Sequence, residues 1–186
     1  MPVTTLDPTS ALIVIDLQKG VIGLPLAHPA EDVVARTTDL LRAFRERGLP
    51  VVLVNVAGAP GGRTDGGVRT LDFPEGWTEL IPELEQQAGD LLVTKYARSA
   101  FTGTGLAERL RGLGVTQVVV TGIATGGGVE STARDAHEQG FHVTLPVDAM
   151  TDRDMGQHEH SVVRLFPRIA ETGTTRDVLD ALAARS

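Results

Sequence analysis

The sequence predicts an α/β protein of three layers, in which helices cover both faces of a parallel sheet. Short apolar runs alternate along the chain with longer segments whose apolar residues recur at helical spacing. The first of these runs, ALIVI at 11–15, is continuously apolar, which is typical of a strand buried on both faces of a parallel sheet. Strand and helix alternate throughout, which favours parallel strands joined by helical crossovers.

Length and composition predict one domain spanning residues 1–186. The chain has 186 residues, of which 41% are hydrophobic and 22% charged. Such a chain is long enough to bury a core and has the composition of a globular protein. No repeat, low-complexity tract or linker divides it.

The first strand is predicted at residues 11–16, where the apolar run ALIVI ends in Asp16. Residues 31–47 have apolar side chains at helical spacing and are followed by Gly48, a common helix terminator. The run VVLVN at 51–55 is the second strand. The glycine-rich segment 58–67 predicts a mobile loop.

In the second half, a short helical stretch is expected at 77–87, and the third strand, LLVTK at 91–95, ends in Lys95. The spacing of Glu130 and Arg134 supports a helix there, and Thr174 and Asp177 have the spacing of a capping box. The remaining elements expected are helices at 106–113, 129–139 and 157–165, strands at 115–122, 142–148 and 168–170, and a helix after Thr174.

Charge and cysteine content exclude several kinds of partner and site. The formal net charge is −7 with no basic cluster, which argues against nucleic-acid binding. No apolar run is long enough to span a bilayer, and the N-terminus lacks a secretion signal, so we expect a cytoplasmic protein without a membrane partner. The absence of cysteine excludes disulfides, thiolate metal sites and a thiol nucleophile.

Three features are expected at the same edge of the sheet. Asp16 and Lys95 end strands, and the glycine-rich turn 122–128 follows another. Ligands of open parallel sheets bind beyond the carboxyl ends of the strands. Burial raises the pKa of a carboxyl group and a nearby lysine lowers it, so such a pair is suited to proton transfer. Strand ends are also often polar because they reach solvent, so each residue alone would be weak evidence.

Three segments together resemble the isochorismatase-like cysteine hydrolases. They are ALIVIDLQKG at 11–20, KYARSAFTGTGL at 95–106 and TGIATGGGVESTARDAHEQGFHVTLPVDA at 121–149, in the family's order and spacing. The resemblance implies a six-stranded parallel sheet of Rossmann-like architecture and a catalytic triad of Asp, Lys and Cys. Asp16 and Lys95 match the first two members, but Gly128 stands where the cysteine should be.

Gly128 changes the chemistry that the resemblance implies. Ser131 and Thr132 lie nearby but not at the nucleophile position. Within the family, isochorismatases proper look like members that also have glycine at the nucleophile position. They hydrolyse a vinyl ether, and the Asp acts as the acid. We therefore expect a hydrolase of a small anionic substrate that uses Asp16 and Lys95 without a thiolate. The alternative is a non-catalytic binding or scaffold member that has lost the nucleophile.

The resemblance also implies the rest of the site. The Ile123–Ala124 peptide would be cis, and the backbone N–H groups of Ala124 and Gly128 would face a substrate oxygen. The other candidates for the pocket wall are Gln18, Arg98, Ser99 and Phe101.

No cofactor or metal is expected, because NVAGAPGG stands at 55–62 in place of the Asp-x-His metal motif of related nicotinamidases. The glycine run fits no nucleotide-binding pattern, since Ser131 occupies the third glycine position of G-x-G-x-x-G. Family members are commonly oligomeric, so a homodimer or homotetramer is expected. The histidines are scattered in sequence, and surface or capping roles are expected for all of them: His28, His137, His142, His158 and His160.

Overall fold

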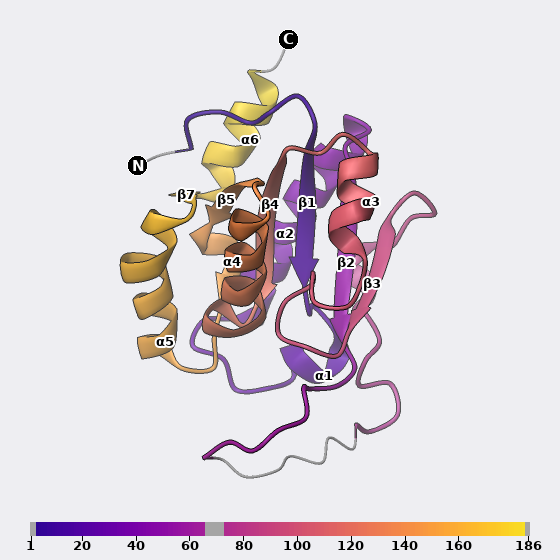
Figure 1. Cartoon of the computed structure of the whole chain (residues 1–186), viewed down its shortest axis with the longest axis vertical. Coiled ribbons are helices and arrows are strands. Elements are labelled where there is room, and N and C mark those ends of the chain that lie inside the picture. The colour runs from indigo at the N-terminus through magenta and orange to yellow at the C-terminus, as the bar shows by residue number, and fades with distance from the viewer. Residues whose placement is uncertain (1–2, 66–72, 185–186) are drawn as a thin grey trace.

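The fold is built on one parallel sheet, described by a computed structural model for residues 3–65 and 73–184 (Figure 1). The end of the predicted glycine-rich loop, Gly66 and Gly67, lies outside the described residues, as does Arg69 just after it. The strands are β1 (Ser10–Ile15), β2 (Val51–Val56), β3 (Leu91–Lys95), β4 (Gln117–Ile123), β5 (His142–Pro146), β6 (Met150–Thr151) and β7 (Glu171–Gly173).

The strand order confirms the predicted parallel sheet. Six strands follow the path β3-β2-β1-β4-β5-β7, and the short β6 pairs with β4 as a seventh. Every pairing between these strands is parallel. β1 lies between β2 and β4 and is buried along its whole length, which explains its continuously apolar sequence.

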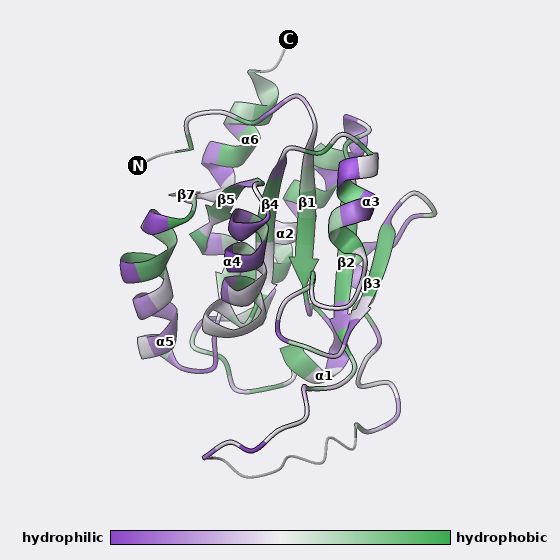
Figure 2. Cartoon of the chain, in the orientation of Figure 1, coloured by the Kyte–Doolittle hydropathy of each residue, from purple (hydrophilic) through white to green (hydrophobic). Residues whose placement is uncertain are grey.

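Helices cover both faces of this sheet. The helical elements are α1 (Lys19–Ile22), α2 (Ala30–Glu46), α3 (Leu106–Gly112), α4 (Glu130–Glu138), α5 (Met155–His160) and α6 (Thr175–Ala183), with shorter turns at Pro82–Leu84, Thr125–Val129, Val147–Ala149, Ser161–Leu165 and Phe166–Arg168. Leu12 and Val14 of β1 pack with α2 and α6, whereas Ile13 and Ile15 pack with α3 and α4. Figure 2 shows the apolar strands enclosed between helices with polar outer faces.

Two local interactions that the sequence predicts are present in the structure. Thr174 and Asp177 form a reciprocal capping box at the start of α6. Arg134 donates to Glu130 across one turn of α4 at 3.0 Å. In the residues that the structure describes, no helix has both the length and the hydropathy needed to cross a membrane.

Three expected elements need correction. Residues 77–87 form turns and a single 3₁₀ turn at Pro82–Leu84, which ends where Glu85 adopts a left-handed backbone with φ 45°. The strand expected at 168–170 begins three residues later, as β7, because Pro167 lies in a 3₁₀ turn. The helix expected at 157–165 begins two residues earlier, at Met155, and α5 ends at His160, before the separate turn Ser161–Leu165.

Candidate active site

Asp16 occupies a special backbone position immediately after β1. Its φ is 52°, in the left-handed region that few residues other than glycine adopt. Its N–H still donates to Val54 O of β2 at 3.0 Å, so the residue stays fixed to the sheet. Such conformations in residues other than glycine concentrate at functional sites, where the surrounding structure enforces them. The turn carries the carboxylate away from the strand direction and onto the wall of a cavity.

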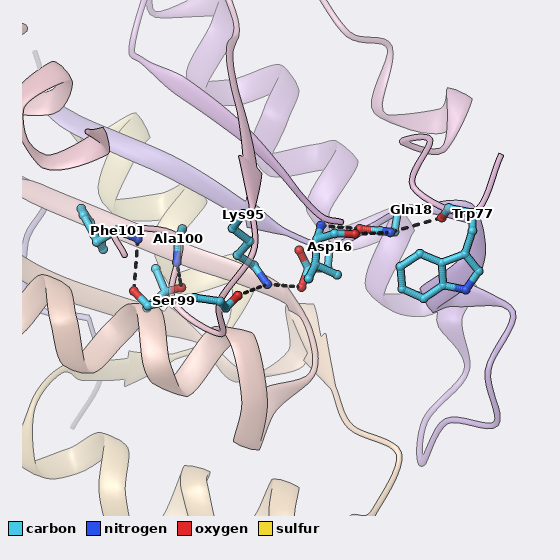
Figure 3. Close-up of polar contacts among 10 residues, drawn as sticks. Asp16, Gln18, Trp77, Lys95, Ser99, Ala100 and Phe101 are labelled. Atoms are coloured by element: carbon cyan, nitrogen blue, oxygen red, sulfur yellow. Dashed lines mark hydrogen bonds and ion pairs between the residues drawn. The ribbon is translucent and has the colours of Figure 1, made fainter. Parts of the chain in front are cut away.

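Lys95, the last residue of β3, forms a buried ion pair with Asp16. Its Nζ lies 2.7 Å from Asp16 Oδ2 and also donates to Ala97 O at 3.3 Å (Figure 3). The side chains of Lys95 and Asp16 are only 2% and 7% exposed. The structure therefore brings together two residues that lie 79 positions apart in the chain.

Two opposing effects set the protonation of Asp16. Burial raises the pKa of its carboxyl group, the charge and hydrogen bond of Lys95 lower it, and burial dominates, which brings the pKa to about 6. Asp16 Oδ1 is buried and has no hydrogen-bond partner among the described residues. A carboxyl group in this setting can hold a proton near neutral pH and can release it to a bound molecule.

Gly128 faces this carboxyl group from the turn Thr125–Val129. A Cβ at position 128 would lie 3.3 Å from Asp16 Oδ2 and 2.8 Å from Ile15 Cγ2. The second distance is too short for an undisturbed contact, so Ile15 already limits the space for a side chain. The Ile123–Ala124 peptide is cis, as the resemblance implied. Ala124 O accepts from the N–H groups of Gly127 and Val129 at 3.0 and 3.2 Å.

Gly122 allows β1 and β4 to approach closely just before this turn. It has φ 116°, and a Cβ there would lie 2.1 Å from Ile15 O, so no other residue fits without moving the strands. Gly122 pairs with Ile15, the residue before Asp16. This glycine therefore helps to set the distance between Asp16 and the turn that carries Gly128.

A cavity of about 720 Å³ opens beside the Asp16–Lys95 pair. Among the described residues that line it, Lys95, Arg63, Arg98 and Arg153 are basic and Asp16 alone is acidic. Within residues 3–65 and 73–184, no carboxylate lies within ion-pairing distance of the three arginines. The wall is therefore locally cationic, although the chain as a whole carries a formal charge of −7. Val21, Leu24, Val56 and Ile123 add an apolar side to the cavity.

The residues expected on the pocket wall divide into two groups. Arg98, Ala124 and Gly128 line the cavity, together with Asp16 and Lys95. Gln18, Ser99 and Phe101 do not line it, so their assignment to the wall needs correction. All three are buried and make contacts within the protein.

The contacts of these buried side chains explain their position (Figure 3). Gln18 binds both the N–H and the carbonyl oxygen of Val56, at 2.7 and 3.1 Å. Ser99 Oγ accepts from Phe101 N–H at 3.1 Å. The Phe101 ring stacks on Phe141 with centroids 5.9 Å apart. These residues support the segments next to Asp16 and Lys95.

Sequence reasoning missed Arg63, Arg153 and Gly127 on the cavity wall. The two arginines come from irregular segments, where no periodicity marks a position as facing a site. The surface or capping role expected for His28 and His158 needs correction, because both are partly buried and their ring centroids lie 4.8 Å apart. His137, His142 and His160 are exposed, as expected.

The site offers no constellation typical of a metal centre. In the part of the chain that the structure describes, no three His, Asp or Glu side chains are grouped so that they could hold an ion. Among the described residues that line the cavity, the charged or titratable side chains are one carboxyl group, one ammonium group and three guanidinium groups, and Thr64 and the backbone of the glycine turn add further polar groups. This set can bind an anion and exchange a proton with it.

Known proteins with similar sequences share this architecture. Residues 10–177 match the isochorismatase domain. YecD of Escherichia coli, an uncharacterised isochorismatase family protein, is 38% identical over 94% of this chain and 96% of its own. Maleamate amidohydrolase of Pseudomonas putida is 30% identical over 92% of this chain and 86% of its own. An isochorismatase family protein of Burkholderia thailandensis superimposes with a TM-score of 0.92 at 39% identity, covering 98% of this chain and 99% of that one.

Proposed function

The chain belongs to the isochorismatase family of hydrolases, and within it we propose that this member hydrolyses a small anionic substrate by acid catalysis from Asp16, without a covalent intermediate. The observation that carries the proposal is the Asp16 carboxyl group. It is buried, has a pKa raised to about 6, and faces a glycine on the cavity wall. With no cysteine in the chain, a thiolate route is not open to it.

Hydrolysis of a vinyl ether is the reaction that suits these groups. Protonated Asp16 would transfer its proton to the terminal carbon of the double bond, leaving an oxocarbenium ion and the Asp16 carboxylate. Water would add to the cationic carbon, and the resulting hemiketal would separate into a ketone and an alcohol. One proton of the added water would return to Asp16, so the carboxyl group is regenerated and atoms and charge balance.

Lys95 would act on the charge that forms during this transfer. Its ammonium group contacts Asp16 Oδ2, so it stabilises the carboxylate left after the proton has moved. The other oxygen, Oδ1, is the one without a partner among the described residues and would carry the proton. The backbone N–H groups of Ala124 and Gly128 would orient a substrate oxygen at the same end of the cavity.

The cationic wall supports an anionic substrate. Arg63, Arg98 and Arg153 offer planar donors suited to a carboxylate, and each lacks an ion-pair partner within the described ranges. A cavity of about 720 Å³ accommodates a small molecule beside Asp16. The apolar residues on its other side would contact the carbon skeleton of such a substrate.

The proposal includes the setting of the enzyme. We propose that residues 1–186 act as one domain in the cytoplasm, without a cofactor, a nucleic-acid partner or a membrane partner. We also propose a homodimer or homotetramer, because the cavity opens at loops that a neighbouring chain could cover. Light scattering should give a mass of two or four chains, and a mass of one chain, 19.7 kDa, would contradict this part.

A substrate panel tests the proposed reaction. Vinyl ethers, amides and imides, each with and without a carboxylate, are incubated with the wild type and with Asp16→Asn, and folding is checked by circular dichroism. We expect turnover of an anionic vinyl ether that Asp16→Asn lacks. Saturable binding with no product from any compound would favour the alternative, a non-catalytic binding member of the family. Full turnover by folded Asp16→Asn would exclude Asp16 as the acid.

A further inference from the structure

The glycine turn Thr125–Val129 has a second side, which faces away from the cavity. Gly127 and Gly128 line the cavity, whereas the side chain of Thr125 is fully buried on the other side. The segment Asp152–Ser161, which includes α5, packs against that outer side. The turn therefore lies between the site and the segment Asp152–Ser161, of which only Arg153 is among the described residues that line the cavity.

Three side chains of this segment bind the turn and the first residue of α4. Asp152 Oδ2 accepts from Gly126 N–H at 2.7 Å. His158 Nδ1 lies 2.8 Å from Thr125 Oγ1, and Ser161 Oγ donates to Glu130 Oε2 at 2.6 Å. We call Asp152, His158 and Ser161 the clamp.

The clamp is itself fixed by the surrounding structure. Asp152 Oδ1 accepts from the N–H groups of Arg153 and Asp154 at 2.7 and 3.3 Å, and the Asp152 carbonyl oxygen accepts from Ala27 N–H at 2.7 Å. The His28 ring lies edge-on to the His158 ring. His28 Nδ1 is in turn 2.9 Å from Thr151 Oγ1. Two of the three clamp residues, Asp152 and His158, are thus also linked to β6 and to the loop before α2.

We infer that Asp152, His158 and Ser161 are positioning residues, which hold the turn so that the backbone of Gly127 and Gly128 faces Asp16. Glycines leave this turn without side chains that could fix it by packing toward the cavity. Gly127 departs from helical geometry, with φ −119° and ψ −106°, so the helical hydrogen bonds alone do not define the turn. Hydrogen bonds from outside supply the missing constraint. The catalytic part of this inference rests on the proposed function.

The protonation of His158 is consistent with this role. Burial and the neighbouring His28 lower the pKa of His158, and Asp152 and Glu159 act in the opposite direction with less effect. His158 is therefore neutral at pH 7, and its Nδ1 can accept a hydrogen bond from the Thr125 hydroxyl group.

The test removes one hydroxyl group from the outer side of the turn. Thr125→Val keeps the shape of the side chain but cannot bind His158, whereas Thr125→Ser keeps the hydroxyl group. Thr121→Val is the matched control, because Thr121 is equally buried and its Oγ1 has no partner among the described residues. Amide hydrogen exchange of residues 125–129 and steady-state kinetics are measured for each variant.

We expect Thr125→Val to speed amide exchange in the turn by about 10-fold, the effect of losing roughly one net hydrogen bond. The value of kcat should fall by at least about 10-fold, since small displacements can cost up to about 10²-fold. KM should change less, because the arginines of the cavity wall are untouched. Thr125→Ser should restore both properties, and Thr121→Val should resemble the wild type.

Two results would overturn the inference: wild-type exchange and kcat in folded Thr125→Val, or equal effects in Thr121→Val. If Thr125→Val does not fold, His158→Phe, with His160→Phe as its exposed control, makes the same test from the other side of the hydrogen bond. If even the wild type lacks turnover that depends on Asp16, the proposed function fails. Amide exchange then decides the positioning inference alone.

Discussion

Two ion pairs in this protein each contain a buried carboxyl side chain, and they differ in how many of its oxygens are hydrogen-bonded. Arg45 of α2 binds Asp90 through Nη2 at 2.6 Å and Nε at 3.3 Å. Asp90 Oδ2 also accepts from Gln87 N–H at 2.8 Å, so both of its oxygens are bound. Asp16 is bound by Lys95 at one oxygen, and its Oδ1 has no partner within the described chain.

We expect the first pair to stabilise the fold and the second to take part in the proposed reaction. The Asp90 side chain is 3% exposed and that of Asp16 is 7% exposed, so the burial of the two carboxyl groups does not distinguish them. Both oxygens of Asp90 are hydrogen-bonded within the protein. Burial raises the pKa of Asp16 to about 6, and its Oδ1, which has no partner among the described residues, leaves a position for a proton. We expect each pair to respond to mutation according to this difference.

The largest effect is expected from breaking the Asp16–Lys95 pair. Asp16→Asn and Lys95→Ala should each lower kcat/KM by at least about 10²-fold, the low end of what a positioned proton-transfer group supplies. The double variant should be little worse than either single variant, because residues that act as a unit are not additive. Activity per folded molecule, with folding checked by thermal melts, measures this. Lost stability with unchanged specific activity would assign the pair a structural role only.

Breaking the Arg45–Asp90 pair should affect stability and leave catalysis unchanged. Asp90→Asn should lower the free energy of unfolding by about 1–3 kcal/mol, less than a fully buried pair would lose, because Arg45 is partly exposed. Urea unfolding gives the change in stability, and kcat/KM per folded molecule should equal that of the wild type. If Asp90→Asn lost as much kcat/KM as Asp16→Asn, the two ion pairs would not differ in their importance for catalysis.

The pH profile sharpens the comparison further. If Asp16 is the acid of the proposed reaction, the rate should depend on its protonated form and fall as pH rises through its pKa of about 6. Lys95 lowers that pKa, so in Lys95→Ala the midpoint of the residual activity should move to higher pH. Asp90→Asn should leave the midpoint unchanged. A midpoint that moves to lower pH in Lys95→Ala would contradict the proposed electrostatics.

No effect is expected from a thiol reagent, and no reaction is expected with simple amides. Iodoacetamide should leave turnover untouched, because the chain has no cysteine to alkylate. Simple amides such as nicotinamide should not be hydrolysed, since the proposed mechanism uses Asp16 as an acid and the chain has no cysteine nucleophile. Both are measured with the assay used for the variants. Rapid hydrolysis of such an amide would show that another nucleophile has been recruited.

Much of the fold could be predicted because its signals are local. Continuous apolar runs indicated parallel strands, and the alternation of strand and helix indicated a sheet covered on both faces. Asp16 and Lys95 were placed at one edge of the sheet because both end strands, and they form an ion pair there. Their catalytic roles, and that of Gly128, remain predictions.

The remaining parts of the site depend on contacts that no local pattern reveals. Arg63 and Arg153 reach the cavity from irregular segments, where side-chain direction follows from tertiary packing. Thr125 and His158 meet across 33 positions, and although Thr125 lies in the segment 121–149 that carries the resemblance, no local pattern pairs it with His158. The sequence order next to Asp16 and Lys95 suggested that Gln18 and Ser99 line the pocket, but buried backbone groups bind both side chains.

Because Lys95 is buried, chemical labelling of lysines can report on access to the site. The chain has two lysines, and Lys19 is about half-exposed whereas Lys95 is almost completely enclosed. An amine-acylating reagent should label Lys19 quickly and reach Lys95 only when the sheet edge around Asp16 opens. A peptide map of the two lysines over time would therefore report how often that opening occurs. A molecule bound in the cavity should slow the labelling of Lys95 alone.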